Sequence, residues 1–210
     1  MSSNLQYLFH DDEIVNKIKS RLPYLFQLAE LESSRAGKIG MEVGSLREKI
    51  IIALLIYKFG EENIETDIPI TQREIDVKLF NNPISIKTAT GKNPNGLKLI
   101  WTVDAESALK FQNNYYPSCD MIFVNIIWGN EGYFNGIPLE VQRNVFDQIG
   151  REKYIKLPRP GTNPRGVEMS KEAIQMLTSD NLTERIPINW KKQEISYRPY
   201  ERWIELWREQ

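Results

Sequence analysis

The chain has 210 residues, of which 41% are hydrophobic, and it carries a formal net charge of −1, one histidine and one cysteine. This length fits a single domain over 1–210, and no apolar run reaches the ~18 residues of a membrane span, so we expect no membrane partner. The scarcity of histidine and cysteine argues against Ser-His-Asp and Cys-His catalysis, histidine-rich zinc sites and internal disulfides, and leaves carboxylates and lysines as candidate catalytic groups.

The first predicted elements are helices. Apolar residues recur at helical spacing over 11–32. After a glycine-bearing loop, Ser45 is expected to cap a strongly apolar helix over about 46–59, with Glu48 at the third position of a capping box. Glu48 also shares the side of part of the buried stripe. Its carboxylate is therefore either the capping acid or a metal ligand directed into a cleft.

A hairpin is predicted over 74–87, which reads Glu-Ile-Asp-Val-Lys-Leu-Phe-Asn-Asn-Pro-Ile-Ser-Ile-Lys. Alternation places Glu74 and Asp76 on one polar face. A two-residue turn at 81–82 would set Asp76 opposite Lys87. Such a pair is either a solvated surface pair contributing under ~1 kcal/mol or a site for metal-dependent phosphodiester hydrolysis.

The remaining elements complete a mixed α/β pattern. A proline- and glycine-rich loop spans 156–167, and the tail 190–210 is rich in tryptophan and tyrosine. We expect that tail to pack on the core or on a second subunit. The order of elements predicts a mixed central β-sheet flanked by helices. The further expected elements are a strand over 97–103, a short helix over 105–112, a buried strand over 121–128, an edge strand over 132–137, and helices over 139–149 and 171–178.

Two absences bear on compartment and cofactor. The N-terminus lacks the basic and apolar regions of a secretory signal, and a single cysteine, Cys119, favours a reducing environment. We therefore expect a cytoplasmic protein. The sequence contains no Gly-x-Gly-x-x-Gly or Walker-type loop, so we expect no nucleotide cofactor.

These residues resemble the PD-(D/E)XK nuclease superfamily, to which many type II restriction endonucleases belong. The family pattern has an acid on a core helix, an Asp on the next strand, and an Asp/Glu-x-Lys strand beside it. Here Glu48 and Asp76 fill the first two positions, and Ser85, Ile86 and Lys87 fill the third. The layout is most similar to the EcoRV-like branch of restriction endonucleases.

The resemblance implies a restriction-endonuclease-like core over about 44–150 and Mg²⁺-dependent hydrolysis of double-stranded DNA. A homodimer would match the two-fold symmetry of a palindromic site. Asp76 would ligate Mg²⁺ together with Glu48 and the Ile86 carbonyl. Lys87 would position or deprotonate the attacking water.

The chain departs from the family pattern at its second acid. Ser85 stands where the family carries Asp or Glu, so a glutamate from elsewhere in the chain would have to replace it. Glu48 and Glu74 are the two candidates. Alternation along the strand places Glu74 on the Asp76 face.

Two polar loops are expected to contact DNA. The loop that carries Lys92, Asn93 and Lys98 follows the catalytic strand and is expected to contact the minor groove or the backbone. The loop 156–167 resembles one that enters the major groove. Arginine reads guanine and asparagine reads adenine there. The candidate base readers in this second loop are Arg159, Thr162, Asn163 and Arg165.

Two other functions stay open on the sequence. A superfamily nuclease for DNA repair or junction processing would need no base-reading loops. A catalytically silent DNA-binding protein would follow from the loss of the second acid. Digestion of mixed-sequence DNA into discrete bands would indicate a restriction enzyme and not a repair nuclease. Any Mg²⁺-dependent cleavage would rule out a catalytically silent protein.

Overall fold

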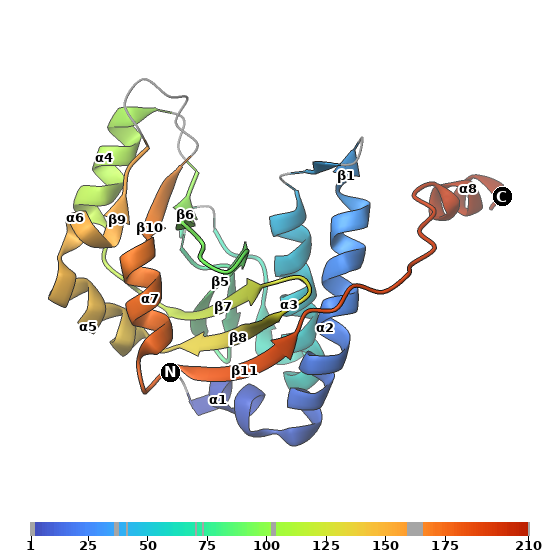
Figure 1. The fold of residues 1–210 in the computed structure, drawn as a ribbon, viewed down its shortest axis with the longest axis horizontal. Helices are drawn as coiled ribbons and strands as arrows, with labels where there is room; N and C mark the ends of the chain where they lie inside the picture. Colours follow the sequence, from blue (N-terminus) through green and yellow to red (C-terminus); the bar gives the residue numbers. More distant parts are fainter. Residues whose placement is uncertain are drawn as a thin grey trace.

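A computed structural model describes residues 3–35, 38–40, 42–69, 71–72, 74–101, 104–158 and 166–209. At its centre lies a six-stranded mixed sheet (Figure 1). Its strands are β3 (Ile64–Glu65), β4 (Val77–Leu79), β5 (Asn82–Thr90), β7 (Asp120–Ile126), β8 (Glu131–Ile137) and β11 (Glu184–Asn189). They lie in the order β11-β8-β7-β5-β4-β3, with β5 and β7 parallel and the other neighbours antiparallel. The predicted mixed sheet flanked by helices is confirmed.

Three helices pack on one face of this sheet: α1 (Ser3–His10), α2 (Asp12–Glu32) and α3 (Val43–Phe59). The Asp11 carboxylate caps α2 by accepting the Ile14 N–H at 3.1 Å. Alternation along β5 turns Ile84 toward these helices, where it is fully buried in one apolar cluster with Ile51 and Leu55 of α3. Among the described helices, none is both long and apolar enough to cross a membrane.

The other face carries a second apolar cluster, built from residues such as Phe123, Val141 and Leu177. The helices here are α4 (Ala105–Asn114), α5 (Leu139–Ile149), α6 (Arg151–Tyr154) and α7 (Lys171–Ser179). Beside them β6 (Gly96–Ile100), β10 (Val167–Ser170) and β9 (Ile155–Lys156) form a small sheet in the order β6-β10-β9. The helices predicted over 105–112, 139–149 and 171–178 are thereby confirmed, as is the buried strand after Cys119.

The hairpin turns at Phe80 and Asn81, one residue earlier than predicted. Both residues have positive φ, 47° and 62°, as a type I′ turn requires. Leu79 and Asn82 therefore flank the turn. Pro83 explains the difference, because the residues that flank a two-residue turn exchange backbone hydrogen bonds and proline has no N–H to donate. In the observed register Pro83 pairs at the next position, where no such bond is needed.

This turn moves the register of the hairpin by two residues. Asp76 comes beside Ser85 rather than directly opposite Lys87, so the predicted cross-strand pair is wrong in its register. The strand itself begins only at Val77. The alternation that was to place Glu74 on the Asp76 face therefore does not extend to these residues.

Two other predicted details are wrong. The helix α3 begins at Val43, with Glu42 at its N-cap, so Ser45 lies within the first turn and caps nothing. Glu48 is consequently not the partner in a capping box, which leaves its carboxylate free for another role. The strand β8 is not an edge strand, because it lies between β7 and β11.

The rest of the described chain consists of short elements and a projecting tail. A small hairpin of β1 (Ser34–Arg35) and β2 (Lys38–Ile39) connects α2 to α3, and a 3-10 turn, η1 (Glu61–Asn63), follows α3. Trp190 is fully buried against Phe26. The backbone of Gln193 still exchanges hydrogen bonds with the Gln27 side chain of α2. Beyond it the chain leaves the body of the molecule toward α8 (Glu201–Arg208), whose residues are all exposed (Figure 1).

Candidate active site

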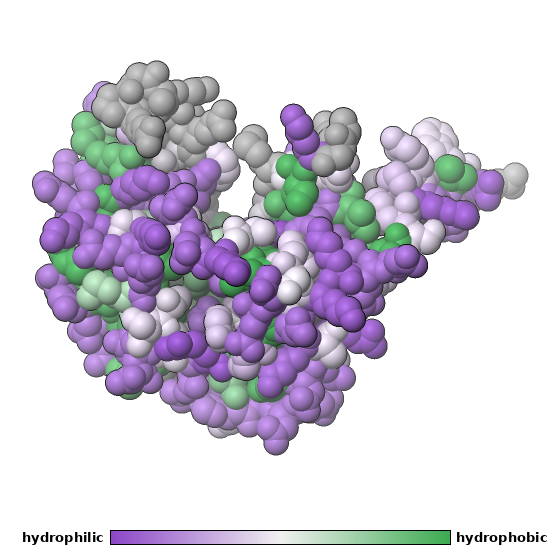
Figure 2. All heavy atoms as spheres, in the orientation of Figure 1, coloured by the Kyte–Doolittle hydropathy of each residue, from purple (hydrophilic) through white to green (hydrophobic). Residues whose placement is uncertain are grey.

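A cavity of about 840 Å³ lies between α3 and β6, at the end of β4. The first turn of α3 and Glu48 line one side of it, the segment 97–101 lines the other, and Asp76 and Lys87 lie between them. The space-filling view shows a notch between the α2–α3 side and the side that carries β6, β9 and β10 (Figure 2). Because the first turn of α3 lines the cavity, the positive end of the α3 dipole points toward it and favours an anion there.

Asp76 is held in one orientation by donors from the neighbouring strand. Its backbone N–H donates to the Ile84 carbonyl at 3.0 Å. Its Oδ2 atom accepts hydrogen bonds from the Ile86 N–H at 2.6 Å, Lys87 Nζ at 2.9 Å and Ser85 Oγ at 3.3 Å. Oδ1 accepts none from any residue that the structure describes. One carboxylate oxygen is therefore fixed to the protein and the other is available to a ligand.

Lys87 and Asp76 form a largely buried ion pair. Their side chains are 13% and 16% exposed, so solvent screens the interaction much less than it would at the surface. The solvated-surface interpretation of this pair is therefore excluded. The predicted association of acid and lysine is found, although the two residues meet across the end of β4 instead of in the predicted register.

Glu48 reaches the same cavity from α3. Burial, together with the charge of Asp76, raises the pKa of its carboxyl from 4.5 to about 6, against smaller opposing effects of Lys87 and Lys49. No described residue forms a hydrogen bond or ion pair with Glu48. A half-buried carboxylate without a partner, beside a second carboxylate, is an arrangement that a cation would stabilise.

The oxygen atoms around Asp76 suit a hard divalent cation. Within a strand the N–H and C=O of one residue project to the same side, and the Ile86 N–H meets Asp76. The Ile86 carbonyl therefore also faces the cavity side, beyond the end of β4. In the described part of the chain no group of three His, Cys, Asp or Glu side chains could hold a metal. Asp76, Glu48 and one carbonyl, completed by water, match the sparse ligand sets of Mg²⁺ sites.

Glu74 is engaged elsewhere. Its Oε1 atom accepts from the Tyr115 hydroxyl at 2.8 Å, and its Oε2 atom accepts from the Ser118 N–H at 3.1 Å and from the Ser118 hydroxyl. It lines a separate hollow with these partners and not the cavity around Asp76. Of the two candidates to replace the missing acid, only Glu48 is placed beside Asp76.

The residues predicted to contact DNA are divided between two places. Lys98 lies in the Asp76 cavity, with Nζ 3.3 Å from the centre of the Trp101 ring. Lys92 and Asn93 are exposed and line a different cavity, against α7. The predicted base readers Arg159, Thr162, Asn163 and Arg165 lie outside the described residues.

Sequence reasoning missed Trp101, whose side chain is 59% exposed at the edge of the Asp76 cavity. The strand predicted over 97–103 includes Trp101. In the structure β6 ends at Ile100, so Trp101 lies outside the strand and its side chain is not buried with those of the strand. Exposed aromatic rings beside a lysine are a common feature of nucleic-acid-binding surfaces.

Two comparisons with known proteins point to one family. A family model described as "Restriction endonuclease ThaI" matches residues 8–209. The chain belongs to the ThaI restriction endonuclease family. A solved structure described as a restriction endonuclease in complex with substrate DNA is 59% identical, covers 97% of this chain and 98% of its own, and superimposes with a TM-score of 0.92. No curated protein sequence matches.

Family membership settles the class of function. The protein is a restriction endonuclease, a site-specific DNA-cleaving enzyme, as the sequence predicted. The repair-nuclease and silent DNA-binding alternatives are thereby displaced. The similarity to the EcoRV-like branch stays a prediction.

Proposed function

We propose that this endonuclease cleaves both strands of a palindromic DNA site as a Mg²⁺-dependent homodimer, with Glu48, Asp76 and Lys87 as its catalytic residues. The supporting observation is the state of Asp76. One of its oxygens is fixed by Lys87 and the Ile86 N–H, while the other has no partner among the described residues and lies near a Glu48 carboxylate that also has none.

The metal would be held by Asp76 Oδ1, the Glu48 carboxylate and the Ile86 carbonyl. When bound, Mg²⁺ polarises the scissile phosphate and lowers the pKa of a coordinated water. Lys87, anchored on Asp76 Oδ2, is positioned to orient the attacking water and to offset the negative charge that develops on the phosphate.

Glu48 takes the role of the acid missing at Ser85. Ser85 is fully buried and donates to Asp76, so it orients the ligand instead of binding the metal itself. Glu48 comes from a helix on the other side of the cavity. Glu48 and Asp76 together thus give the site two carboxylates, although the hairpin carries no second acid.

DNA would enter the notch between α3 and β6. The first turn of α3, Lys98 and Trp101 line the cavity and would contact the backbone near the scissile phosphate. We assign base reading to the loop with Arg159, Asn163 and Arg165, as the sequence predicted, with Thr162 beside them. Lys92 and Asn93 would contact DNA outside the catalytic cavity.

The homodimer is inferred from the target symmetry and from the projecting tail. A two-fold protein dimer matches a palindromic site. The helix α8 exposes Trp203, 56% exposed, and Trp207, 89% exposed, and none of its residues that the structure describes is buried. A second copy of the chain is the partner that such a surface would contact.

The proposed compartment is the cytoplasm. Buried, unpaired Cys119 is consistent with a reducing cytoplasm.

Run-off sequencing of plasmid DNA cut by the purified protein with Mg²⁺ tests this function. We expect discrete fragments whose ends map to one short sequence, with cuts placed symmetrically on the two strands. Asp76→Ala run in parallel should leave the plasmid intact. Random fragment ends, or cutting that continues in the presence of a chelator, would contradict the proposal.

A further inference from the structure

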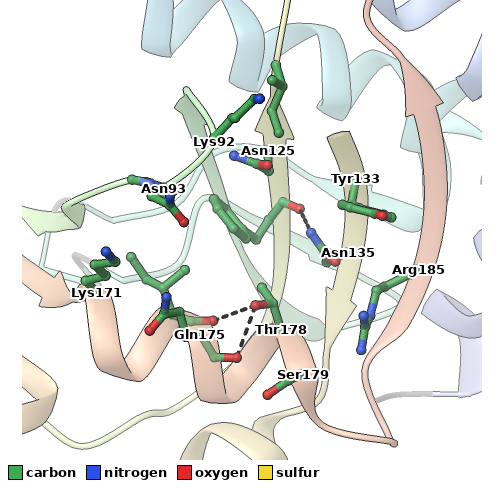
Figure 3. Close-up of a pocket in the computed structure, with 14 residues that line it drawn as sticks. Lys92, Asn93, Asn125, Tyr133, Asn135, Lys171, Gln175, Thr178, Ser179 and Arg185 are labelled. Atoms are coloured by element: carbon green, nitrogen blue, oxygen red, sulfur yellow. Dashed lines mark hydrogen bonds between the residues drawn. The ribbon is translucent and has the colours of Figure 1, made fainter. Parts of the chain in front are cut away.

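A second cavity, of about 300 Å³, lies between α7 and the strands β7 and β8 (Figure 3). Its 14 lining residues include none that line the cavity around Asp76. They come from the loop after β5, from β7 and the residues after it, and from β8, β11 and α7. A volume of this size falls at the lower end of the range typical of small-molecule sites.

At the base of this cavity Asn135 has an unused acceptor. Its side chain amide donates to the Phe123 carbonyl at 2.9 Å, as drawn in Figure 3, and the residue is 1% exposed. Its Oδ1 atom is buried and accepts no hydrogen bond from any residue that the structure describes. A buried carbonyl that accepts no hydrogen bond destabilises the fold. A ligand or a water that donates a hydrogen bond would remove this penalty.

The mouth of the cavity is cationic. Lys92, Lys171 and Arg185 come from three different elements and lie on three sides of it in Figure 3. All three are exposed, and none forms an ion pair with another residue in the described ranges. Arg185 is the cross-strand partner of Asn135, so both side chains project from the same face of the sheet. None of the described residues that line it is acidic. The site therefore favours an anionic ligand.

The walls of the cavity are apolar and partly aromatic. Tyr133 and Phe123 line it from the sheet, and Ile174 lines it from α7. Such walls suit a flat apolar ring. Inorganic phosphate alone would leave these walls and Asn135 unused, and an uncharged base would leave the cations unused. A ring with N–H groups, joined to a phosphate, uses all three features.

We propose that this cavity binds a nucleotide unit, with a base N–H donating to Asn135 Oδ1 and the phosphate held by Lys171 and Arg185. Two sources share this chemistry: a free mononucleotide, and a nucleotide in an unpaired end of a DNA strand. The site uses neither the catalytic carboxylates nor a metal.

Calorimetric titration of the metal-free protein tests the site. Deoxyguanosine 5′-monophosphate carries both N–H groups and a phosphate, and we expect it to bind with a Kd of about 0.1–1 mM. Deoxyguanosine and inorganic phosphate should each bind at least about tenfold more weakly. Lys171→Glu and Arg185→Glu, both at exposed positions, should each weaken the binding of the mononucleotide about tenfold. Lys19→Glu, at an exposed position on α2, is the matched control and should change nothing.

Each result of the titration bears on a different part of the proposed site. Equal binding of phosphate alone overturns the role of the base, and equal binding of deoxyguanosine overturns the role of the cations. Absence of mononucleotide binding at millimolar concentration overturns the proposal and leaves water as the partner of Asn135. If a duplex with a short overhang displaces the mononucleotide and a blunt duplex does not, the source is a DNA end. Displacement by neither supports a free nucleotide. Failure here leaves the cleavage activity assigned to Asp76 untouched.

Discussion

Arg47 and Glu30 form a buried ion pair, with Arg47 Nη2 2.6 Å from Glu30 Oε1 and each side chain 5% exposed. Trp128 Nε1 donates to the same oxygen at 2.7 Å, and Arg47 Nη1 donates to Thr90 Oγ1 at 3.2 Å. Arg47 directly precedes Glu48 in α3. The pair therefore fixes the helix that carries Glu48 against α2 and the end of β5.

Removal of Glu30 should unfold the protein more easily. Glu30→Ala leaves the Arg47 charge buried and unpaired, which lowers the free energy of unfolding by about 3–5 kcal/mol. Urea denaturation measures this loss. Glu13→Ala, which breaks an exposed pair with Lys17, is the control and should change it by less than about 0.5 kcal/mol. A loss below about 1 kcal/mol for Glu30→Ala would mean that the buried pair does not hold the helix.

Glu48→Gln should stabilise the metal-free protein in a pH-dependent way. The pKa of Glu48 in the folded protein, about 6, lies above the ordinary value of 4.5. The folded state therefore holds a proton that the unfolded chain releases, and stability falls as pH rises from 4.5 through 6. We expect Glu48→Gln to raise Tm at pH 8 and to leave it unchanged at pH 4.

The same variant tests the metal site without an activity assay. Mg²⁺ should raise Tm of the wild type above pH 6, where Glu48 is ionised, and should raise it much less for Glu48→Gln. Glu152→Gln, at an exposed position on α6, is the control and should behave like the wild type. An equal effect of Mg²⁺ on all three proteins would exclude Glu48 from the ligand set.

Ser85→Asp should not restore a family-type acid. Ser85 is fully buried and its hydroxyl lies 3.3 Å from Asp76 Oδ2, so a carboxylate there would face a like charge without solvent. We expect it to destabilise the fold and to leave Glu48→Ala inactive when the two are combined. Ser85→Ala should retain activity within a few-fold. Rescue of Glu48→Ala by Ser85→Asp, measured by plasmid cleavage, would show that the second acid belongs in the hairpin after all.

The exposed tryptophans of α8 should matter for assembly and not for the monomer fold. Trp203→Glu combined with Trp207→Glu is expected to weaken the homodimer at least about tenfold in sedimentation analysis, because the apolar surface is lost only from the contact between copies. Leu182→Glu, 57% exposed before β11, is the matched control. A dimer unchanged by the tail substitutions would place the interface elsewhere.

Much of the fold followed from local patterns. The apolar periodicity of α2 and α3 and the continuous apolar run of β7 each predicted the right element, because each depends on neighbours in sequence. The hairpin register was missed because a two-residue turn fits either Asn81-Asn82 or Phe80-Asn81. Only the missing N–H of Pro83 decides between them.

The part of the site that was predicted also depends on residues that are close in sequence. Asp76 and Lys87 are close in sequence, and the family pattern names both. The partners of Glu74 are Tyr115 and Ser118, about forty residues away. No pattern within the hairpin could have shown that they hold this carboxylate away from Asp76. The capping box predicted for Glu48 depended on a helix start three residues after the true one.

The most direct test of the central claim compares cleavage and binding by Lys87→Ala with those of Lys78→Ala. Lys78 lies in the same hairpin and pairs with Glu65 at 2.8 Å, away from Asp76. On a duplex that carries the cleaved sequence, with Mg²⁺, we expect Lys87→Ala to lose about 10³-fold in cleavage rate while still binding the duplex. Lys78→Ala should cut at nearly the wild-type rate. Retention of cleavage by Lys87→Ala within about tenfold would contradict the assignment of the catalytic site.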